Sequence, residues 1–149
     1  RLELESCPFS PHQLLQNVES LFTANARHKG IRLIGRVEEG VAAHLVGDEN
    51  RLRQVLCNLV SNAIKYNLAQ QNIVVASTVD DISISNAGTT PLKHPDHLYN
   101  RFYRESDGIK ATGLGLAIVK HIIEGHNQTL NVRSTLGVGT TFGFTLQKA

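Results

Sequence analysis

A stretch in the first half of the chain, DENRLRQVLCNLVSNAIKYN, constrains the fold more than any other feature. Asp48 opens it in the position of a helix N-cap, where a carboxylate accepts hydrogen bonds from amides of the first turn. The apolar residues that follow recur every three or four positions and form one broad helical face, which belongs against a hydrophobic core. The residues of this face are Leu52, Val55, Leu56, Leu59, Val60, Ala63 and Ile64.

Length and composition allow one such core. With 149 residues, 41% of them hydrophobic, the chain is long enough for a single domain and short for two. Fifteen Lys and Arg stand against 13 Asp and Glu, without long runs of like charge, so we expect no nucleic-acid partner. No apolar stretch approaches a membrane span and RLELESCPFS lacks the regions of a signal peptide, so we expect a soluble segment without direct membrane contact.

Cysteine usage favours a reducing compartment. Cys57 falls inside the apolar helical run, where a reduced and buried thiol is the simpler interpretation than a disulfide with Cys7.

The remaining pattern alternates helices and strands. A helix is predicted from Ser10-Pro11, a cap followed by proline at the first helical position, up to Gly30. Another is predicted from Gly113 to Glu124, after a loop-rich region over residues 86–112. Strands are predicted at Leu2 to Leu4, 31–37, 44–46, 73–78, 82–85, 130–134 and 140–146, with residues 79–81 as a tight antiparallel connection.

A polar stripe runs beside the apolar face of the helix over residues 48–66. Asn58, Asn62 and Tyr66 are spaced four apart and Lys65 lies close to the same line, within an arc of roughly 100°. An asparagine oxygen can complete a magnesium shell, a lysine can neutralise phosphate, and a tyrosine ring can cover a base or sugar. The alternative is a solvated helix edge whose amides satisfy nearby backbone groups.

Glycines open the helix that follows residue 112. In Thr112-Gly113-Leu114-Gly115-Leu116 they let backbone amides approach a phosphate, while the helix N-terminus adds partial positive charge. Neither a G-x-x-x-x-G-K-[ST] loop nor a G-x-G-x-x-G after a strand is present. A tight turn into a buried helix is the alternative. Just upstream, in LYNRFYR, Leu98 and Phe102 form an i, i+4 apolar pair on a short helical turn, with Arg104 in solvent. In the functional interpretation, Phe102 anchors the base of a mobile lid and Arg104 contacts phosphate.

In order and wording these pieces resemble the catalytic ATP-binding domain of bacterial sensor histidine kinases over essentially the whole chain. NLVSNAIKYN is similar to the N box of that family, LYNRFYR to its F box, TGLGLAIVKHIIEGH to its G2 box, and GVGTTFGFTL to its last glycine motif. The resemblance implies a Bergerat-type α/β two-layer sandwich: a mixed, mostly antiparallel sheet of about five strands, covered on one face by about three helices. Residues 1–9 would then follow a helical dimerisation domain that lies outside the chain.

The same resemblance implies the site and the cofactors, ATP and Mg²⁺. Asn62 would coordinate magnesium with Asn58 nearby, Lys65 would contact phosphate, and Tyr66 and Tyr103 would line the nucleotide pocket. The full set of expected nucleotide-binding residues is Asn58, Asn62, Lys65, Tyr66, Asn86, Gly88, Thr90, Tyr103, Arg104, Thr112, Gly113, Leu114, Gly115, Leu116 and Thr140.

One box departs from the family's D-x-G-x-G. The chain reads Asn86-Ala87-Gly88-Thr89-Thr90, which replaces the aspartate that accepts the adenine amino group. An amide oxygen still accepts that bond but loses charge assistance, at a cost on the order of 1 kcal/mol. Thr90 restricts a backbone that glycine would leave free. A plain turn is the alternative for this segment.

The phosphorylated histidine of the family is missing. None of the seven histidines precedes the acidic residue and proline of a phosphoacceptor helix, and surface or packing roles fit them better. The resemblance therefore implies a module that presents the γ-phosphate to a histidine on a helical domain of the same protein, with a response regulator downstream and a cytoplasmic location in a membrane-bound sensor. No catalytic residue is expected within the chain itself.

Two other functions stay open. The altered box also fits a degenerate binding module with weak or no kinase activity. A chaperone or topoisomerase ATPase fits less well, because Asn58 stands where those proteins carry a glutamate base.

Overall fold

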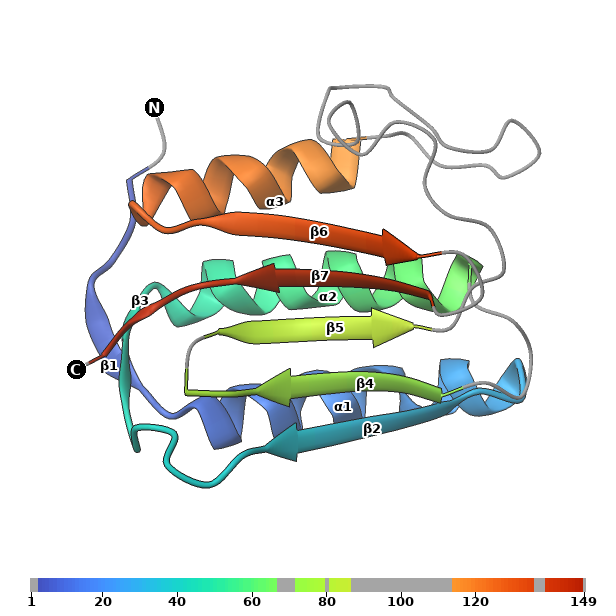
Figure 1. The fold of residues 1–149 in the computed structure, drawn as a ribbon. Helices are drawn as coiled ribbons and strands as arrows, with labels where there is room; N and C mark the ends of the chain where they lie inside the picture. The colour runs from blue at the N-terminus through green and yellow to red at the C-terminus, as the bar shows by residue number, and fades with distance from the viewer. Residues whose placement is uncertain (1–2, 67–71, 80, 87–113, 136–138, 149) are drawn as a thin grey trace.

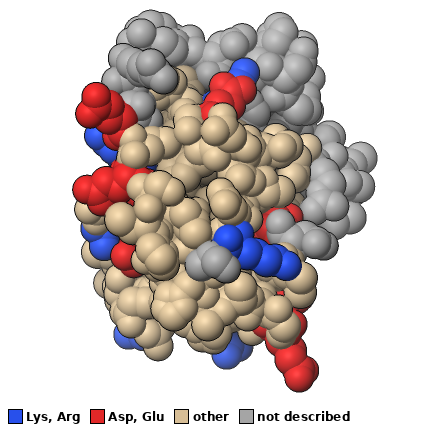
Figure 2. Space-filling model, turned by 90° about the vertical axis from the view of Figure 1, so that its left-hand side faces the viewer, with Lys and Arg blue, Asp and Glu red and all other residues tan. Residues whose placement is uncertain are grey.

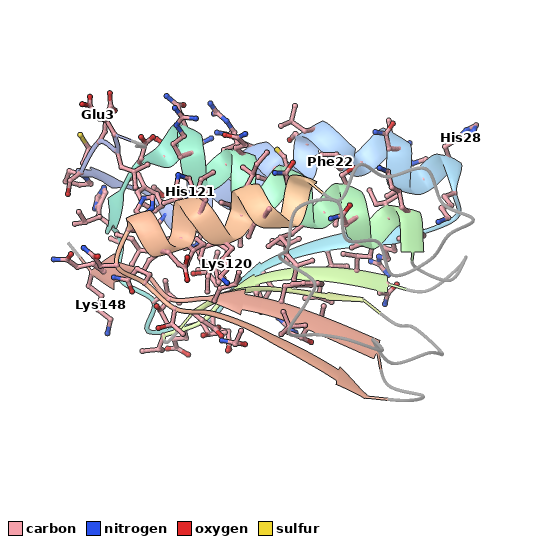
Figure 3. All side chains as sticks on the ribbon, turned by 90° about the horizontal axis from the view of Figure 1, so that it is seen from above. Glu3, Phe22, His28, Lys120, His121 and Lys148 are labelled. Carbon is pink, nitrogen blue, oxygen red and sulfur yellow. The ribbon has the colours of Figure 1, made fainter. Side chains whose placement is uncertain are left out.

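The computed structural model has two layers, a five-stranded sheet and three helices on one of its faces (Figures 1 and 3). It describes residues 3–66, 72–79, 81–86, 114–135 and 139–148. Helix α1 spans Pro11–His28, α2 spans Glu49–Tyr66 and α3 spans Leu114–Gly125. Figure 1 shows α2 between the other two helices, behind the middle of the sheet. The predicted α/β sandwich is confirmed.

The sheet has the order β2-β4-β5-β7-β6. Strands β2 and β4 are parallel and every other neighbouring pair is antiparallel. A parallel pair requires a crossover connection, and α2 lies in the chain between these two strands. Their bounds are Arg32–Val37 for β2, Asn72–Ser77 for β4, Ile82–Asn86 for β5, Leu130–Thr135 for β6 and Gly139–Phe144 for β7.

The core lies between the two layers. In β4 and β5, alternate residues are buried: Ile73, Val75 and Ser77, and Ile82 and Ile84. The register aligns them across the sheet, as in the row of Val75, Ile84 and the partly buried Phe142. The apolar face of α2 fills the layer above, with Leu52, Val55, Leu56 and Val60 each fully buried. The broad face predicted for this helix is therefore its core face.

The ends of α1 follow the predicted signals. Ser10 caps the helix, since its Oγ accepts a hydrogen bond from the Gln13 amide at 3.2 Å, and Pro11 is the first helical residue. At the other end the chain leaves the helix through Gly30, whose φ of 75° is the left-handed conformation that glycine adopts most easily. The prediction for this helix is confirmed at both ends.

A second, small sheet closes the end of the molecule where both termini lie (Figure 1). It has the order β1-β3-β8, with β1 at Cys7–Phe9, β3 at Leu45–Gly47 and β8 at Gln147–Lys148. The predicted strand at Leu2 to Leu4 is wrong, because Leu4 is outside any strand and Leu2 is outside the described residues. Leu4 instead packs on the end of α3. Its Cδ1 lies 3.0 Å from the position that a Cβ on Gly125 would take.

Figure 2 shows this end of the molecule. Basic and acidic side chains are scattered among uncharged ones, and the described part of this face carries no continuous patch of one sign. That distribution agrees with the near balance of charge in the sequence.

None of the helices in the described part of the chain is long and apolar enough to cross a membrane.

Asp48 and His126 join three segments at this end. The Asp48 carboxylate, 6% exposed, accepts the Glu5 amide at 3.1 Å and caps α2 by accepting the Arg51 amide at 3.2 Å. The Asp48 amide donates to His126 Nε2 at 3.0 Å, and His126 Nδ1 lies 2.8 Å from the Ile122 carbonyl. Because an amide only donates and a carbonyl only accepts, Nε2 is the acceptor of this pair of hydrogen bonds and Nδ1 the donor.

Gly47 leaves room for this arrangement. A Cβ on Gly47 would lie 3.1 Å from Nε2 of the His126 ring and 2.9 Å from Leu52 Cδ1. The strand before the cap must therefore carry a glycine for the imidazole to lie against its backbone. Sequence reasoning expected a surface or packing role for each histidine, and His126 has a structural role through these two hydrogen bonds.

Replacing His126 by alanine is expected to destabilise the chain by about 1–3 kcal/mol, because the Asp48 amide would lose its acceptor. Urea denaturation measures this as a lower midpoint. His126→Gln should lose less, since its amide oxygen can replace Nε2 as the acceptor. His121→Ala, at an exposed position on α3, the helix that ends just before His126, is the matched control. Equal midpoints for His126→Ala and His121→Ala would contradict this role.

Candidate functional site

The predicted site residues that the structure describes lie at the end of the molecule opposite the small sheet (Figure 1). Helix α2 ends there and α3, which packs against it, begins there. Strand β5 ends and β7 begins at the same end, and the register pairs Asn86 with Thr140. Segments far apart in the chain, residues 58–66, 86, 114–116 and 140, are thus brought to one end of the sandwich.

The polar stripe of α2 has the predicted placement at the edge of the core. Asn58 and Asn62 are half-buried and lie next in sequence to fully or largely buried Leu59 and Ala63, while Lys65 is exposed. Tyr66 is the last residue of the helix. The structure thus offers two amide groups one turn apart and one exposed cation, all on the last two and a half turns of one helix.

The end of α2 is held by a lysine from α1. The Lys29 ammonium donates to the carbonyl of Lys65 at 2.8 Å and to the carbonyl of Ile64. Sequence reasoning missed this residue. The available signal was a basic residue beside a helix-ending glycine, which locates a positive charge but gives no partner.

Strand β5, the middle strand of the sheet, carries the first residue of the altered box. Asn86 is its last residue, and its backbone is paired with Ile73 on one side and Thr140 on the other. Both neighbours are within strands, so the backbone position from which Asn86 projects is fixed by the sheet rather than by a loop.

Helix α3 begins at Leu114, so Gly115 and Leu116 belong to its first turn. The first backbone amides of a helix have no intrahelical acceptor and carry partial positive charge. At this end of the molecule, the start of α3 therefore presents hydrogen-bond donors beside the amide-bearing end of α2. The predicted residues Gly88, Thr90, Tyr103, Arg104, Thr112 and Gly113 lie outside the described residues.

In chemical terms, these described groups suit an anion together with a hard cation. Side-chain amide oxygens are magnesium ligands, and backbone amides at a helix start together with a lysine are phosphate ligands. No cluster of three or more His, Cys, Asp or Glu that would hold a metal by itself occurs in the part of the chain that the structure describes.

Comparison with known proteins decides the family. A family model described as "Histidine kinase-, DNA gyrase B-, and HSP90-like ATPase" matches residues 47–149. The chain belongs to this ATPase family. The two-layer arrangement described above is the Bergerat fold of histidine kinase catalytic domains.

Several similar proteins are histidine kinases. The sensor histidine kinase GacS of Pseudomonas protegens is 34% identical over 98% of this chain, which spans 17% of GacS. The catalytic domain of histidine kinase ThkA has a TM-score of 0.83 and 27% identity, covering 97% of this chain and 96% of that one. ThkA is also known in complex with the response regulator protein TrrA, at a TM-score of 0.79 with 25% identity, covering 98% of this chain and 42% of that one.

A further solved structure, full-length ShkA in complex with AMPPNP, has a TM-score of 0.81 and 30% identity. It covers 99% of this chain, which spans 32% of ShkA. This chain therefore corresponds in sequence and fold to the catalytic, ATP-binding part of histidine kinases. The same matches confirm the family resemblance drawn from the sequence motifs.

Cys57 lies on α2 directly before Asn58 and is half-buried, and both cysteines are free thiols. Burial raises the pKa of the Cys57 thiol, and the nearby Arg53 guanidinium lowers it only in part. The thiolate is the reactive form, so a raised pKa reduces reactivity at neutral pH.

We expect iodoacetamide to modify exposed Cys7 faster than Cys57 in the folded chain at neutral pH, as followed by peptide mass spectrometry. The Cys57 rate should keep rising with pH above about 9, where an ordinary thiol is already mostly ionised. Arg53→Gln should slow the Cys57 reaction further, because it removes the charge that favours the thiolate. Equal rates in urea would show that the fold causes the difference, whereas a faster Cys57 in the folded state would refute it.

Proposed function

We propose that this chain binds Mg-ATP and presents the γ-phosphate to a histidine on a separate helical domain of a two-component sensor kinase. The observation that carries the proposal is the convergence of the α2 stripe, the start of α3 and the β5–β7 end at one end of a histidine-kinase fold. The AMPPNP bound by full-length ShkA supports a nucleotide as the ligand.

Each group has a role that its chemistry allows. Asn62 would supply an amide oxygen to magnesium with Asn58 beside it, and Lys65 would offset phosphate charge. Backbone amides at Leu114, Gly115 and Leu116 would cradle the phosphates at the start of α3. Bound magnesium would spread the charge that builds up on the β- and γ-phosphate oxygens during transfer.

The nucleophile comes from elsewhere. An imidazole nitrogen of the acceptor histidine would attack the γ-phosphorus in line, the bond to the β,γ-bridging oxygen would break, and ADP would leave. This chain contributes position and charge compensation to that step. It is therefore expected to bind nucleotide alone and to transfer phosphate only with its helical domain present.

The partners follow from the same proposal. They are the dimerisation and phosphoacceptor helical domain of the same protein and, after transfer, a response regulator, as in the complex of ThkA with TrrA. We place the reaction in the cytoplasm, where ATP is available and where free thiols such as Cys7 and Cys57 persist.

The altered box argues for a weaker adenine contact rather than a lost one. Asn86 keeps an acceptor oxygen at a backbone position fixed between two strands. A degenerate module that kept the fold for partner contacts is the second candidate, and it is motivated by Asn86 and Thr90 together. A water-activating ATPase is disfavoured, because the half-buried Asn58 amide cannot act as a base.

Binding is tested by isothermal titration of this chain with ATP, with and without magnesium. We expect magnesium-dependent binding, and Asn62→Ala should weaken it on the order of tenfold or more by removing a ligand to a charged group. Gln54→Ala, at an exposed position on the same helix, should bind like the unmodified chain. Absence of heat or thermal shift at millimolar ATP would refute nucleotide binding.

Phosphotransfer is tested in a protein that joins this chain to its helical domain. Asn86→Asp should tighten ATP binding several-fold by restoring charge assistance, and the double variant with Thr90→Gly should change the rate of histidine phosphorylation little. A large gain in rate would instead favour the degenerate module. The rate is measured as transfer of label from radiolabelled ATP to the histidine at saturating magnesium.

A further inference from the structure

Lys29 connects the end of α1 to the end of α2. It is the C-cap residue of α1, and the Gly30 turn behind it is closed by the Ile31 amide, which donates to the Ala26 carbonyl at 2.8 Å. Ile31 is 4% exposed and anchors this turn in the core. The backbone of Lys29 is thus fixed on both sides, and its side chain alone spans the distance to α2.

The atoms that Lys29 contacts explain why it is there. Helix α2 spans Glu49–Tyr66, so the carbonyls of Ile64 and Lys65 belong to its last turn, the part of a helix whose carbonyls need partners from outside it. The Lys29 ammonium donates to both. The carbonyl end of a helix also carries a partial negative charge of about half an elementary charge, which a cation offsets.

The same turn of α2 carries the groups proposed to meet ATP. Lys65 is one of the two residues whose carbonyls accept from Lys29, and Asn62 lies two residues before the other, Ile64. Figure 3 shows His28, the neighbour of Lys29, at the end of the molecule where α2 terminates. An uncompensated negative helix end at this place would repel a triphosphate. Among the residues that the structure describes, Lys29 donates hydrogen bonds directly to this helix end.

We propose that Lys29 is a positioning residue for the phosphates of the nucleotide. It fixes the last turn of α2, and hence Asn62 and Lys65, and it offsets the negative pole of that helix for a polyanionic ligand. This inference rests on the proposed binding of Mg-ATP. The proposal is that Lys29 acts through α2 and the field at its end, and does not itself contact the ligand.

Lys29→Met separates this role from a purely local one. It keeps the length and apolar stem of the side chain but removes the charge and the donors. At low salt, binding of Mg-ATP should weaken about two- to fivefold, the range expected for a cation at a helix C-terminus. Binding of adenosine, which lacks phosphate, should stay the same within error. NMR titration measures both affinities in one preparation, including weak ones.

Two variants make the comparison specific. Lys29→Arg keeps a cation with several donors and should restore Mg-ATP affinity to near that of the unmodified chain. Arg27→Met removes one positive charge from the last turn of α1, at an exposed position, and should change ATP affinity less than Lys29→Met. The affinity loss of Lys29→Met should also shrink at high salt, because the contact is exposed and screened.

Amide hydrogen exchange tests the positioning independently of nucleotide. In the ligand-free chain, Lys29→Met should speed exchange in the last turn of α2 and leave the start of that helix, held by Asp48, unchanged. Equal ATP affinities for Lys29→Met and the unmodified chain, or an equal loss of ATP and adenosine binding, would overturn the inference while the proposed function stands. Failure of the unmodified chain to bind ATP would instead remove the proposed function and this role with it.

Discussion

The structure depends on the burial of one face of α2. This helix lies between α1 and α3 over the middle of the sheet, and its apolar residues are fully or nearly fully buried (Figure 1). Burying a Leu or Val side chain contributes about 1.5–3 kcal/mol, so this face alone is a large part of the driving force for folding. Because the apolar face is fixed against the core, the polar edge next to it has no freedom to rotate. Asn58 and Asn62 are half-buried as a direct result of where Leu59 and Val60 must lie.

The two ends of α2 are secured in different ways. At the start, Asp48 caps the helix and is itself held by the amide of Glu5 and linked to His126, so uncharged donors and a buried carboxylate fix this end. At the other end, Lys29 binds the last carbonyls from outside. A negative group thus lies at the positive pole and a positive group at the negative pole, the arrangement that favours a helix. The cap at the start is buried, whereas the contact at the end is exposed.

Most of the fold could be predicted from local signals. Apolar periodicity indicates the helix over residues 49–66, and capping residues indicate the start at Ser10 and the stop at Gly30. Both kinds of signal act over a few residues. The misplaced first strand shows the limit, because Leu4 is apolar for a contact with α3 that lies more than a hundred residues away in the chain. Strand β8 was not predicted for a similar reason: Gln147 and Lys148 have no strand-like composition, and only pairing with β3 makes them a strand.

The same difference between local and long-range signals decides which parts of the candidate site could be predicted. Asn58, Asn62 and Lys65 were found because they share one helix, and their spacing alone puts them on one edge. Their relation to Asn86, Thr140 and the start of α3 depended on motif resemblance, since no local rule brings a strand end and two helix ends together. Lys29 was missed for the opposite reason: it belongs to no motif used to recognise the site, and its partners are backbone carbonyls whose need for a donor exists only once α2 has ended. Residues that complete a helix end from another helix must therefore be sought in the structure, by asking which terminal carbonyls and amides have found their partners.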